Sequence, residues 1–177
     1  MLETEKIKLR APEPEDLDAL YAWENDTDFW HIGHSTSPYS RHALKRYIEE
    51  LEHDIFSTGQ LRFIIELKSE RKAIGTIDVY DFDAFHSRAG IGILIDENYR
   101  GRGYAGLAVK LLLEYGFSFL KIHQFYAYIP ENNEASVKLF LSNGFTLSGK
   151  LNDWINASTY TNVFIYQKIN ISNYLEQ

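Results

Sequence analysis

The chain has 177 residues, of which 45% are hydrophobic and 15% aromatic, so it can fold around a core of its own. It contains no cysteine, which excludes disulfide bonds and thiolate metal sites within it. Its net charge of −7 disfavours nucleic acid as a partner. The same charge would attract cationic small molecules or basic peptides, or it serves only to keep the protein soluble. No apolar run is long enough to cross a membrane and no leader segment opens the chain, so we expect a cytoplasmic protein without a membrane partner.

The first third of the chain carries one strand signal followed by helix signals. A short strand is predicted over residues 5–9, and the acidic, proline-containing stretch after it begins a first helix. A less regular segment covers residues 27–39. Ser40 is typical of a helix cap, and apolar residues recur behind it at helical spacing until Gly59, which predicts one continuous second helix between these two residues.

Strand-like alternation dominates from Leu61 onward, interrupted by two further helices. The remaining predicted elements are a hairpin of strands 61–67 and 73–80, a strand 89–95, a helix 107–120, a strand 124–129, a helix 133–143 and a hairpin of strands 145–154 and 159–168. No linker, repeat or low-complexity stretch divides the chain. The order β-α-α-β-β-β-α-β-α-β-β therefore predicts one α/β domain over residues 1–177, with a core from about residue 5 to residue 168.

The stretch from Tyr99 to Gly106 separates a buried strand from an amphipathic helix. It holds three glycines and two arginines, and it leads directly into the helix N-terminus. Such a loop points backbone N–H groups and the positive end of a helix at one place, where glycine allows close backbone approach and arginine adds charged hydrogen bonds. The sequence therefore predicts a site for a phosphorylated ligand here.

Three known classes of phosphate loop could be considered, and a different feature of the sequence argues against each of them. Gly101, Gly103 and Gly106 match the dinucleotide fingerprint, but a Rossmann unit places this loop after an early strand and follows it with further parallel units. The Gly-Lys-Ser/Thr of a P-loop NTPase is missing. A kinase glycine loop joins two strands, whereas this loop opens a helix.

The same loop, read as Arg100-x-x-Gly103-x-Ala105, resembles the pyrophosphate-binding signature of the GCN5-related N-acetyltransferase (GNAT) family. A second stretch, Asn133-x-x-Ser136-x-x-Leu139-Phe140-x-x-x-Gly144-Phe145, resembles the family's other CoA-contacting segment. The opening Ile7-x-Leu9-Arg10-x-x-x-Pro14-x-Asp16 is also typical of it. The resemblance implies a single GNAT domain, with a mixed, mostly antiparallel seven-stranded sheet flanked by about four helices.

The resemblance also implies acetyl-CoA as cosubstrate, without a metal, and assigns the residues that bind it. The strand before the loop would hold the pantetheine amides through its backbone, and the loop would hold the pyrophosphate. Asn133 and Ser136 would add contacts from the next helix. The implied cofactor-binding residues are Ile93, Leu94, Ile95, Arg100, Gly101, Arg102, Gly103, Tyr104, Ala105, Gly106, Asn133, Ser136 and Phe140.

Acetyl transfer to an amine needs a base for the amine and a proton for the departing thiolate. Asp78, Asp81, Asp83 and His86 stand on the strand and turn that face the expected acceptor, and among them Asp78 and Asp81 are the first candidates for the base. The tyrosine that supplies the proton in many family members is replaced here by Phe140. Tyr128, Tyr126 or a water could take over that role, or the chemistry could be slow or lost.

The nearest branches of the family are the polyamine (spermidine) acetyltransferases and the ribosomal-protein N-terminal acetyltransferases. Asp81 matches an acid of the polyamine branch, but two other acids of that branch are replaced by Thr36 and Ser37. We therefore expect acetyl transfer to a primary amine of a small molecule or a peptide N-terminus, by direct attack in a ternary complex, in a protein that could form a homo-oligomer. The alternatives are a CoA-binding or sensing module and, behind it, a Rossmann-type nucleotide binder. The spacing of His31, His34 and His86 does not suit a metal site.

Overall fold

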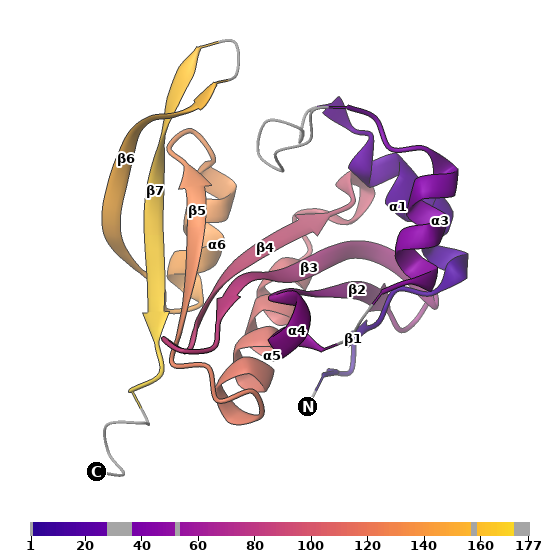
Figure 1. Ribbon diagram of the computed structural model, residues 1–177, viewed down its shortest axis with the longest axis horizontal. Coiled ribbons are helices and arrows are strands. Elements are labelled where there is room, and N and C mark those ends of the chain that lie inside the picture. Colours follow the sequence, from indigo (N-terminus) through magenta and orange to yellow (C-terminus); the bar gives the residue numbers. More distant parts are fainter. Residues whose placement is uncertain (1, 28–36, 52–53, 157–158, 172–177) are drawn as a thin grey trace.

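One seven-stranded sheet organises the computed structural model, which describes residues 2–27, 37–51, 54–156 and 159–171 (Figure 1). The strand order is β1-β2-β3-β4-β5-β7-β6, and every neighbouring pair is antiparallel except β4 and β5. The strands are β1 (Ile7–Arg10), β2 (Leu61–Leu67), β3 (Lys72–Asp83), β4 (Arg88–Ile95), β5 (Gln124–Pro130), β6 (Thr146–Asn156) and β7 (Tyr160–Ile169). The predicted mixed, mostly antiparallel sheet of seven strands is confirmed.

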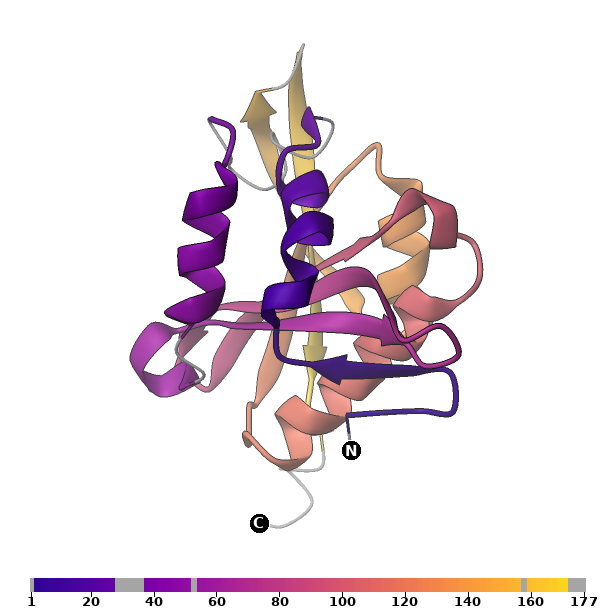
Figure 2. The same cartoon turned by 90° about the vertical axis from the view of Figure 1, so that its right-hand side faces the viewer.

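Helices cover both faces of the sheet, but not along its whole width (Figures 1 and 2). They are α1 (Leu17–Glu24), α3 (Arg41–Glu49), α4 (Ile55–Thr58), α5 (Tyr104–Ser118) and α6 (Glu134–Ser142). Short 3₁₀ turns precede α1 and α5. The five α-helices in the described residues exceed the four that were expected. Of the irregular segment predicted over residues 27–39, residues 28–36, with His31, His34 and Thr36, lie outside the described residues.

The prediction of one continuous helix from Ser40 to Gly59 is wrong, because the chain forms two helices there. Ser40 does cap α3, accepting a hydrogen bond from Ala43 N, and Gly59 does end α4 with φ +70°. Between them Asp54 begins a new helix by accepting a hydrogen bond from Phe56 N. An aspartate side chain that bonds its neighbouring backbone favours a cap over the helix interior, so apolar spacing alone could not show the break.

Two apolar clusters hold the layers together. The larger one lies between α5, α6 and the sheet, and it includes Phe125, Phe140 and Phe145. The smaller one, Leu20, Ile48 and Ile64, joins α1 and α3 to β2 on the opposite face. Side chains alternate between the two faces along each strand, so one half of the sheet can pack against helices on both of its faces.

An ion-pair cluster fixes β1 and the turn after it. Arg10 donates to both carboxylate oxygens of Asp16, at 2.6 and 2.8 Å, and to Glu66 on β2 at 2.5 Å. Asp16 also accepts from the backbone N–H of Glu13. Asp16 and Glu66 are both buried, so the arginine supplies the charge compensation that buried carboxylates need. The Arg10, Pro14 and Asp16 pattern at the start of the chain is thus a structural anchor.

The feature that matters most for function is the junction of β4 and β5. These parallel strands pair over only three positions, from Arg88 with Gln124 to Gly90 with Tyr126. Beyond that point β4 continues to Ile95 and β5 to Pro130, and the two strands diverge (Figure 1). The divergence opens the sheet where its strands end.

Candidate functional site

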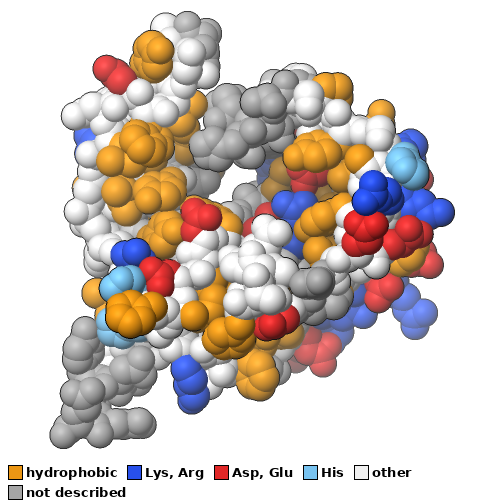
Figure 3. All heavy atoms as spheres, in the orientation of Figure 1, with side chains coloured by type: hydrophobic (Ala, Val, Ile, Leu, Met, Phe, Trp, Pro, Cys, Tyr) orange, Lys and Arg blue, Asp and Glu red, His pale blue; other side chains and the backbone are white. Residues whose placement is uncertain are grey.

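A cleft of about 1660 Å³ occupies the opening between the diverging strands. Its walls come from the second half of β4, the loop before α5, the N-terminal part of α5, one side of α6 and the end of β5. Residues of α1, α3, β2 and β3 complete the wall across from these. Figure 3 shows the hollow between the β5–β7–β6 part of the molecule and the part that carries α1 and α3. A volume of this size exceeds that of typical small-molecule sites, so it has room for a large ligand and a second one.

The glycine-rich loop lines one side of this cleft with bare backbone. Gly101 and Gly103 have φ values of +73° and +82°, which confirms that the loop needs left-handed backbone at both positions. A Cβ built on either glycine would have no atom within 4 Å, so the backbone is open to the cleft. Gly103 is the residue just before α5, at the cap position of this 15-residue helix, and it has no side chain that could cap it. The first backbone amides of a helix have no partner within the helix, so here they are left without a capping side chain.

The two arginines of the loop lie differently. Arg100 lines the cleft, and its Nε donates to the carbonyl oxygen of Ile95 at 2.9 Å, which holds its side chain beside the end of β4. Arg102 donates to the carbonyl of Asn98 and stands over the ring of Tyr99 at 5.4 Å. Arg102 is not among the residues that line the cleft, so its predicted role in binding rests on charge near the loop rather than on a position in the wall.

The strand before the loop presents its backbone to the same cleft. Ile93, Leu94 and Ile95 all line it and are half-buried, and β3 is paired with them on the other side. Opposite this stretch β5 is no longer paired with β4. Backbone groups on the β5 side of β4 are therefore available to a ligand that runs along the strand.

Helix α6 contributes the remaining predicted cofactor residues. The Asn133 side chain accepts from Ser136 N at 3.1 Å and so caps the helix, and both residues line the cleft. Phe140 lines the cleft as well, but it is 3% exposed and packs edge-on against Phe145 with ring centres 4.9 Å apart. The residue at the usual tyrosine position is thus part of the apolar core.

The two predicted bases have different surroundings. Both carboxylate oxygens of Asp78 accept from Arg62, at 2.9 and 3.0 Å. Asp81 lines the cleft, and its side chain has no hydrogen-bond or ion-pair partner among the described residues. Asp81 has φ +48° and sits where the pairing of β3 with β4 becomes irregular, a bulge that turns it out of the regular alternation. Asp81 is the better placed of the two to accept a proton.

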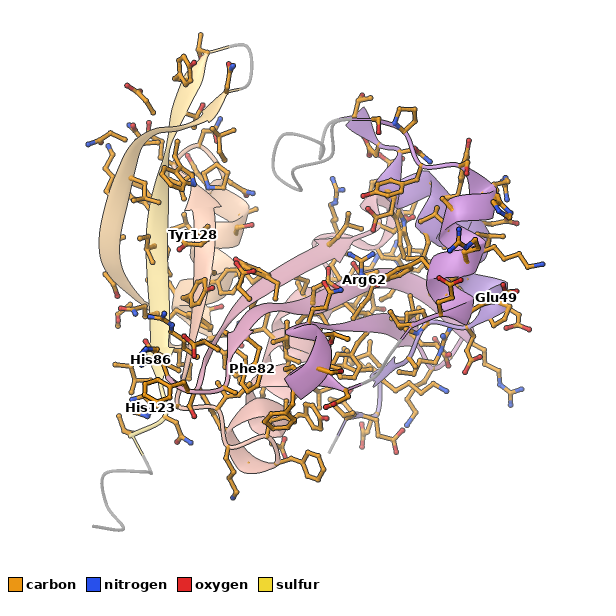
Figure 4. All side chains as sticks on the ribbon, in the orientation of Figure 1. Glu49, Arg62, Phe82, His86, His123 and Tyr128 are labelled. Atoms are coloured by element: carbon orange, nitrogen blue, oxygen red, sulfur yellow. The ribbon has the colours of Figure 1, made fainter. Side chains whose placement is uncertain are left out.

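Three tyrosines stand next to Asp81. Tyr80 packs edge-on against Tyr126, and Tyr126 against Tyr128, with ring centres 6.0 and 5.3 Å apart. Burial, and then the Asp81 charge, raises the pKa of Tyr126 to about 12, and burial likewise raises the pKa of Tyr80. Tyr128 is 44% exposed and lines the cleft, where Figure 4 places it on β5. The phenols of Tyr80 and Tyr126 therefore keep their protons at neutral pH and can donate hydrogen bonds.

Sequence reasoning missed the group that Arg62 organises. Arg62 also donates to Glu24 on α1, at 2.5 Å, so that one guanidinium joins α1, β2 and β3 at the edge of the cleft. Arg62 and Asp78 face each other in the β2–β3 register, which could in principle have revealed the pair. Counting back from the turn would instead have placed Ile77 opposite Arg62, because a bulge between Ile65 and Glu66 shifts the register by one residue.

Two kinds of feature are absent from the part of the chain that the structure describes. No group of three or more histidine, cysteine, aspartate or glutamate side chains there could hold a metal ion. No helix among them is long and apolar enough to span a membrane.

Comparisons with known proteins agree with this geometry. Residues 6–146 match the family model described as the acetyltransferase (GNAT) domain. The chain is 32% identical over 157 residues to the uncharacterized N-acetyltransferase p20 of Bacillus licheniformis, covering 88% of each protein. It is 28% identical over 148 residues to the spermidine N(1)-acetyltransferase of Escherichia coli (strain K12), covering 82% of this chain and 75% of that one. The crystal structure of spermidine N-acetyltransferase from Vibrio cholerae in complex with CoA and spermine is similar with a TM-score of 0.81 and 26% identity, covering 97% and 99% of the two chains.

Proposed function

This chain belongs to the GNAT family and is an acetyl-CoA-dependent N-acetyltransferase, and from this premise we propose that its acceptor is a small polycationic amine of the polyamine type. The observation that carries the proposal is the carboxylate of Asp81, which faces the cleft without a partner beside three tyrosines. A lone carboxylate and aromatic faces attract an ammonium group. The relatives whose names specify spermidine as substrate support the same choice.

Charge is divided between the two sides of the cleft in a way that suits two different substrates. Arg100 and Lys138 lie on the side of the glycine loop and α6. Glu24, Asp78 and Asp81 lie on the side of α1 and β3, together with Arg62. Phosphates are favoured on the first side and a cationic amine on the second.

The residues present fit acetyl-CoA on the loop side. Open backbone at Gly101 and Gly103, uncapped amides at the start of α5 and the Arg100 side chain would hold the pyrophosphate. The unpaired side of Ile93 to Ile95 would pair with the pantetheine amides. Acetyl-CoA then supplies an activated acetyl thioester at the point where β4 and β5 diverge.

We further propose that the amine attacks the thioester directly, in a ternary complex. The chain has no cysteine to carry the acetyl group as a thioester intermediate. In the reaction the neutral amine nitrogen forms the new bond to the acetyl carbon while the carbon–sulfur bond breaks, and the nitrogen then releases one proton, which balances the proton that the thiolate takes up. Before it can attack, the bound ammonium must also give up a proton to become that neutral amine. Asp81 would receive that proton, directly or through a water, because both oxygens of Asp78 are engaged by Arg62.

The proton for the departing thiolate needs a donor other than Phe140. Tyr128 is the candidate, since its phenol is on the cleft wall and partly exposed. Tyr126 is the neighbouring alternative, and its raised pKa keeps it protonated. If neither serves and no amine is turned over, the protein is a CoA-binding or sensing module, as the loss of the usual tyrosine would then imply.

The test measures CoA release with spermidine, butylamine and a peptide with a free N-terminus. We expect spermidine to give the highest kcat/KM, and Asp81→Asn to lower kcat by roughly 10²-fold or more, the scale of general-base catalysis. Asp83→Asn is the matched control, because Asp83 is on the same strand end but bonds to His86 N and Arg88 and does not line the cleft. Equal or better turnover of the peptide would refute the polyamine assignment, and acetyl-CoA binding without turnover of any amine would favour the sensing module.

A further inference from the structure

Among the described residues, two arginines are each shared between two carboxylates, and one of these two arginines lines the cleft. Arg10 joins Asp16 and Glu66 beneath the first turn, away from the cleft. Arg62 joins Asp78 and Glu24 in the cleft wall. Both clusters pair one guanidinium with two carboxylates. The Arg10 cluster lies away from the cleft, which fits a structural role, whereas the Arg62 cluster lines the cleft, where it can also affect the reaction.

The Arg62 cluster is rigid and closely packed. Nε and Nη2 of Arg62 form a fork on the two oxygens of Asp78, Nη1 reaches Glu24, and the guanidinium lies 5.7 Å from the ring centre of Tyr47 on α3. The three charged side chains are only 24–26% exposed. Burial alone lowers the pKa of Arg62, but the two carboxylates reverse this and raise it well above its usual range. Figure 4 shows Arg62 on the sheet beneath α1 and α3.

The groups that act on Arg62 come from three elements: Asp78 is on β3, Glu24 is on α1 and Tyr47 is on α3. Asp81 on β3 and Glu50, which directly follows α3, line the same cleft. Burial raises the pKa of Tyr47, so this phenol is neutral, and Glu50 is paired with Arg46. Arg62, Glu24 and Asp78 together carry a net charge of −1, and without the arginine they would carry −2, in the same cleft that the unpaired Asp81 lines.

We propose that Arg62 is a positioning residue that sets the charge of the acceptor side, so that a cationic amine is attracted but can still lose its proton. This deepens the proposed function and rests on it for the amine acceptor. A primary ammonium must be deprotonated before it attacks, and each added negative charge nearby stabilises the protonated form. Arg62 pairs with both Asp78 and Glu24 and so compensates part of their negative charge. Asp81 is then the carboxylate left to meet the ammonium.

The experiment compares pH–rate profiles of the whole protein with the amine that it turns over best. Arg62→Gln removes the positive charge that both carboxylates share, which stabilises the protonated amine. The acidic limb of the kcat profile should therefore move to higher pH by roughly one unit. The KM for the amine should fall, because the protonated form binds more tightly. Arg62→Lys keeps the charge and should keep the parental profile, although it loses the fork. Arg10→Gln is the control, and it should lower the melting temperature without moving the profile.

A double variant protects the test against a fold that does not tolerate Arg62→Gln alone. Arg62→Gln with Asp78→Asn removes one charge of each sign, returns the wall to its parental net charge and leaves an amide pair in place of the fork. We expect its profile to lie within experimental error of the parent. A folded Arg62→Gln with an unshifted profile, or a double variant shifted as far as the single one, would overturn the proposal. The shift is read on whichever amine is turned over, so its absence is distinguishable from a wrong acceptor class.

Discussion

Adding one methyl group at Gly103 tests whether the glycine loop binds acetyl-CoA through bare backbone. Gly103 has φ +82°, and its missing Cβ would point into open space on the cleft wall. Alanine in this backbone conformation costs about 1–2 kcal/mol of folding free energy, because the methyl group crowds its own carbonyl rather than a neighbour. The same methyl group would stand between the backbone and a phosphate, and losing one charged hydrogen bond costs about 1.5–3 kcal/mol, or roughly 10- to 150-fold in affinity.

Gly59→Ala is the matched control for this prediction. Gly59 has φ +70°, its Cβ would also be free of clashes, with the nearest atom 3.8 Å away, and it does not line the cleft. We expect urea denaturation to show a similar loss of stability in both variants, whereas calorimetric titration with acetyl-CoA should show weaker binding only for Gly103→Ala. If Gly103→Ala binds acetyl-CoA as tightly as the parent, the loop does not approach the phosphates as we infer.

Two further predictions concern aromatic side chains near the reacting centre. Phe140→Tyr should raise kcat, because it restores a phenol at a position on the cleft wall; a steady-state rate that is unchanged or lower would show that the thiolate gains its proton elsewhere. The pKa of Tyr126 is raised from 10.0 to about 12, so the folded state holds the phenol proton more tightly than the unfolded state does. The protonated phenol therefore contributes fully to the free energy of unfolding below pH 10, and this contribution is lost as the pH rises toward 12. Tyr126→Phe should therefore make the urea midpoint less sensitive to pH in that range, and an identical slope in both proteins would contradict the assignment.

The elements that the sequence predicted well are those with strong local signals. Ser40 at the cap of α3, Gly59 with φ +70° at the end of α4 and Asn133 at the start of α6 are all where the pattern placed a helix end. A capping side chain bonds to the backbone two or three residues ahead, and a glycine adopts left-handed backbone at its own position, so the information is local. The helix after the loop is longer at its start than predicted, running from Tyr104, because the first turn follows directly from Gly103.

The parts that could not be predicted depend on long-range geometry. Ile55 continues the apolar spacing of α3, yet it belongs to the larger cluster whereas Ile48 belongs to the smaller one. Nothing local distinguishes one packed face from the other. Likewise Asp78 and Asp81 look equivalent in sequence. A bulge between β2 and β3 brings Asp78 opposite Arg62. A second bulge, between β3 and β4, turns Asp81 toward the cleft.

The divergence of β4 from β5 makes β4 an edge strand in the interior of a sheet. Its backbone from Ile91 to Ile95 is fixed by β3 on one side, from Val79 to Gly75, and carries no strand on the other. An exposed edge at the rim of a sheet invites pairing with other chains, whereas this one faces a cleft whose walls restrict what can pair with it. A ligand that pairs there meets hydrogen-bonding groups already held in strand geometry, so little conformational entropy of the protein is lost on binding.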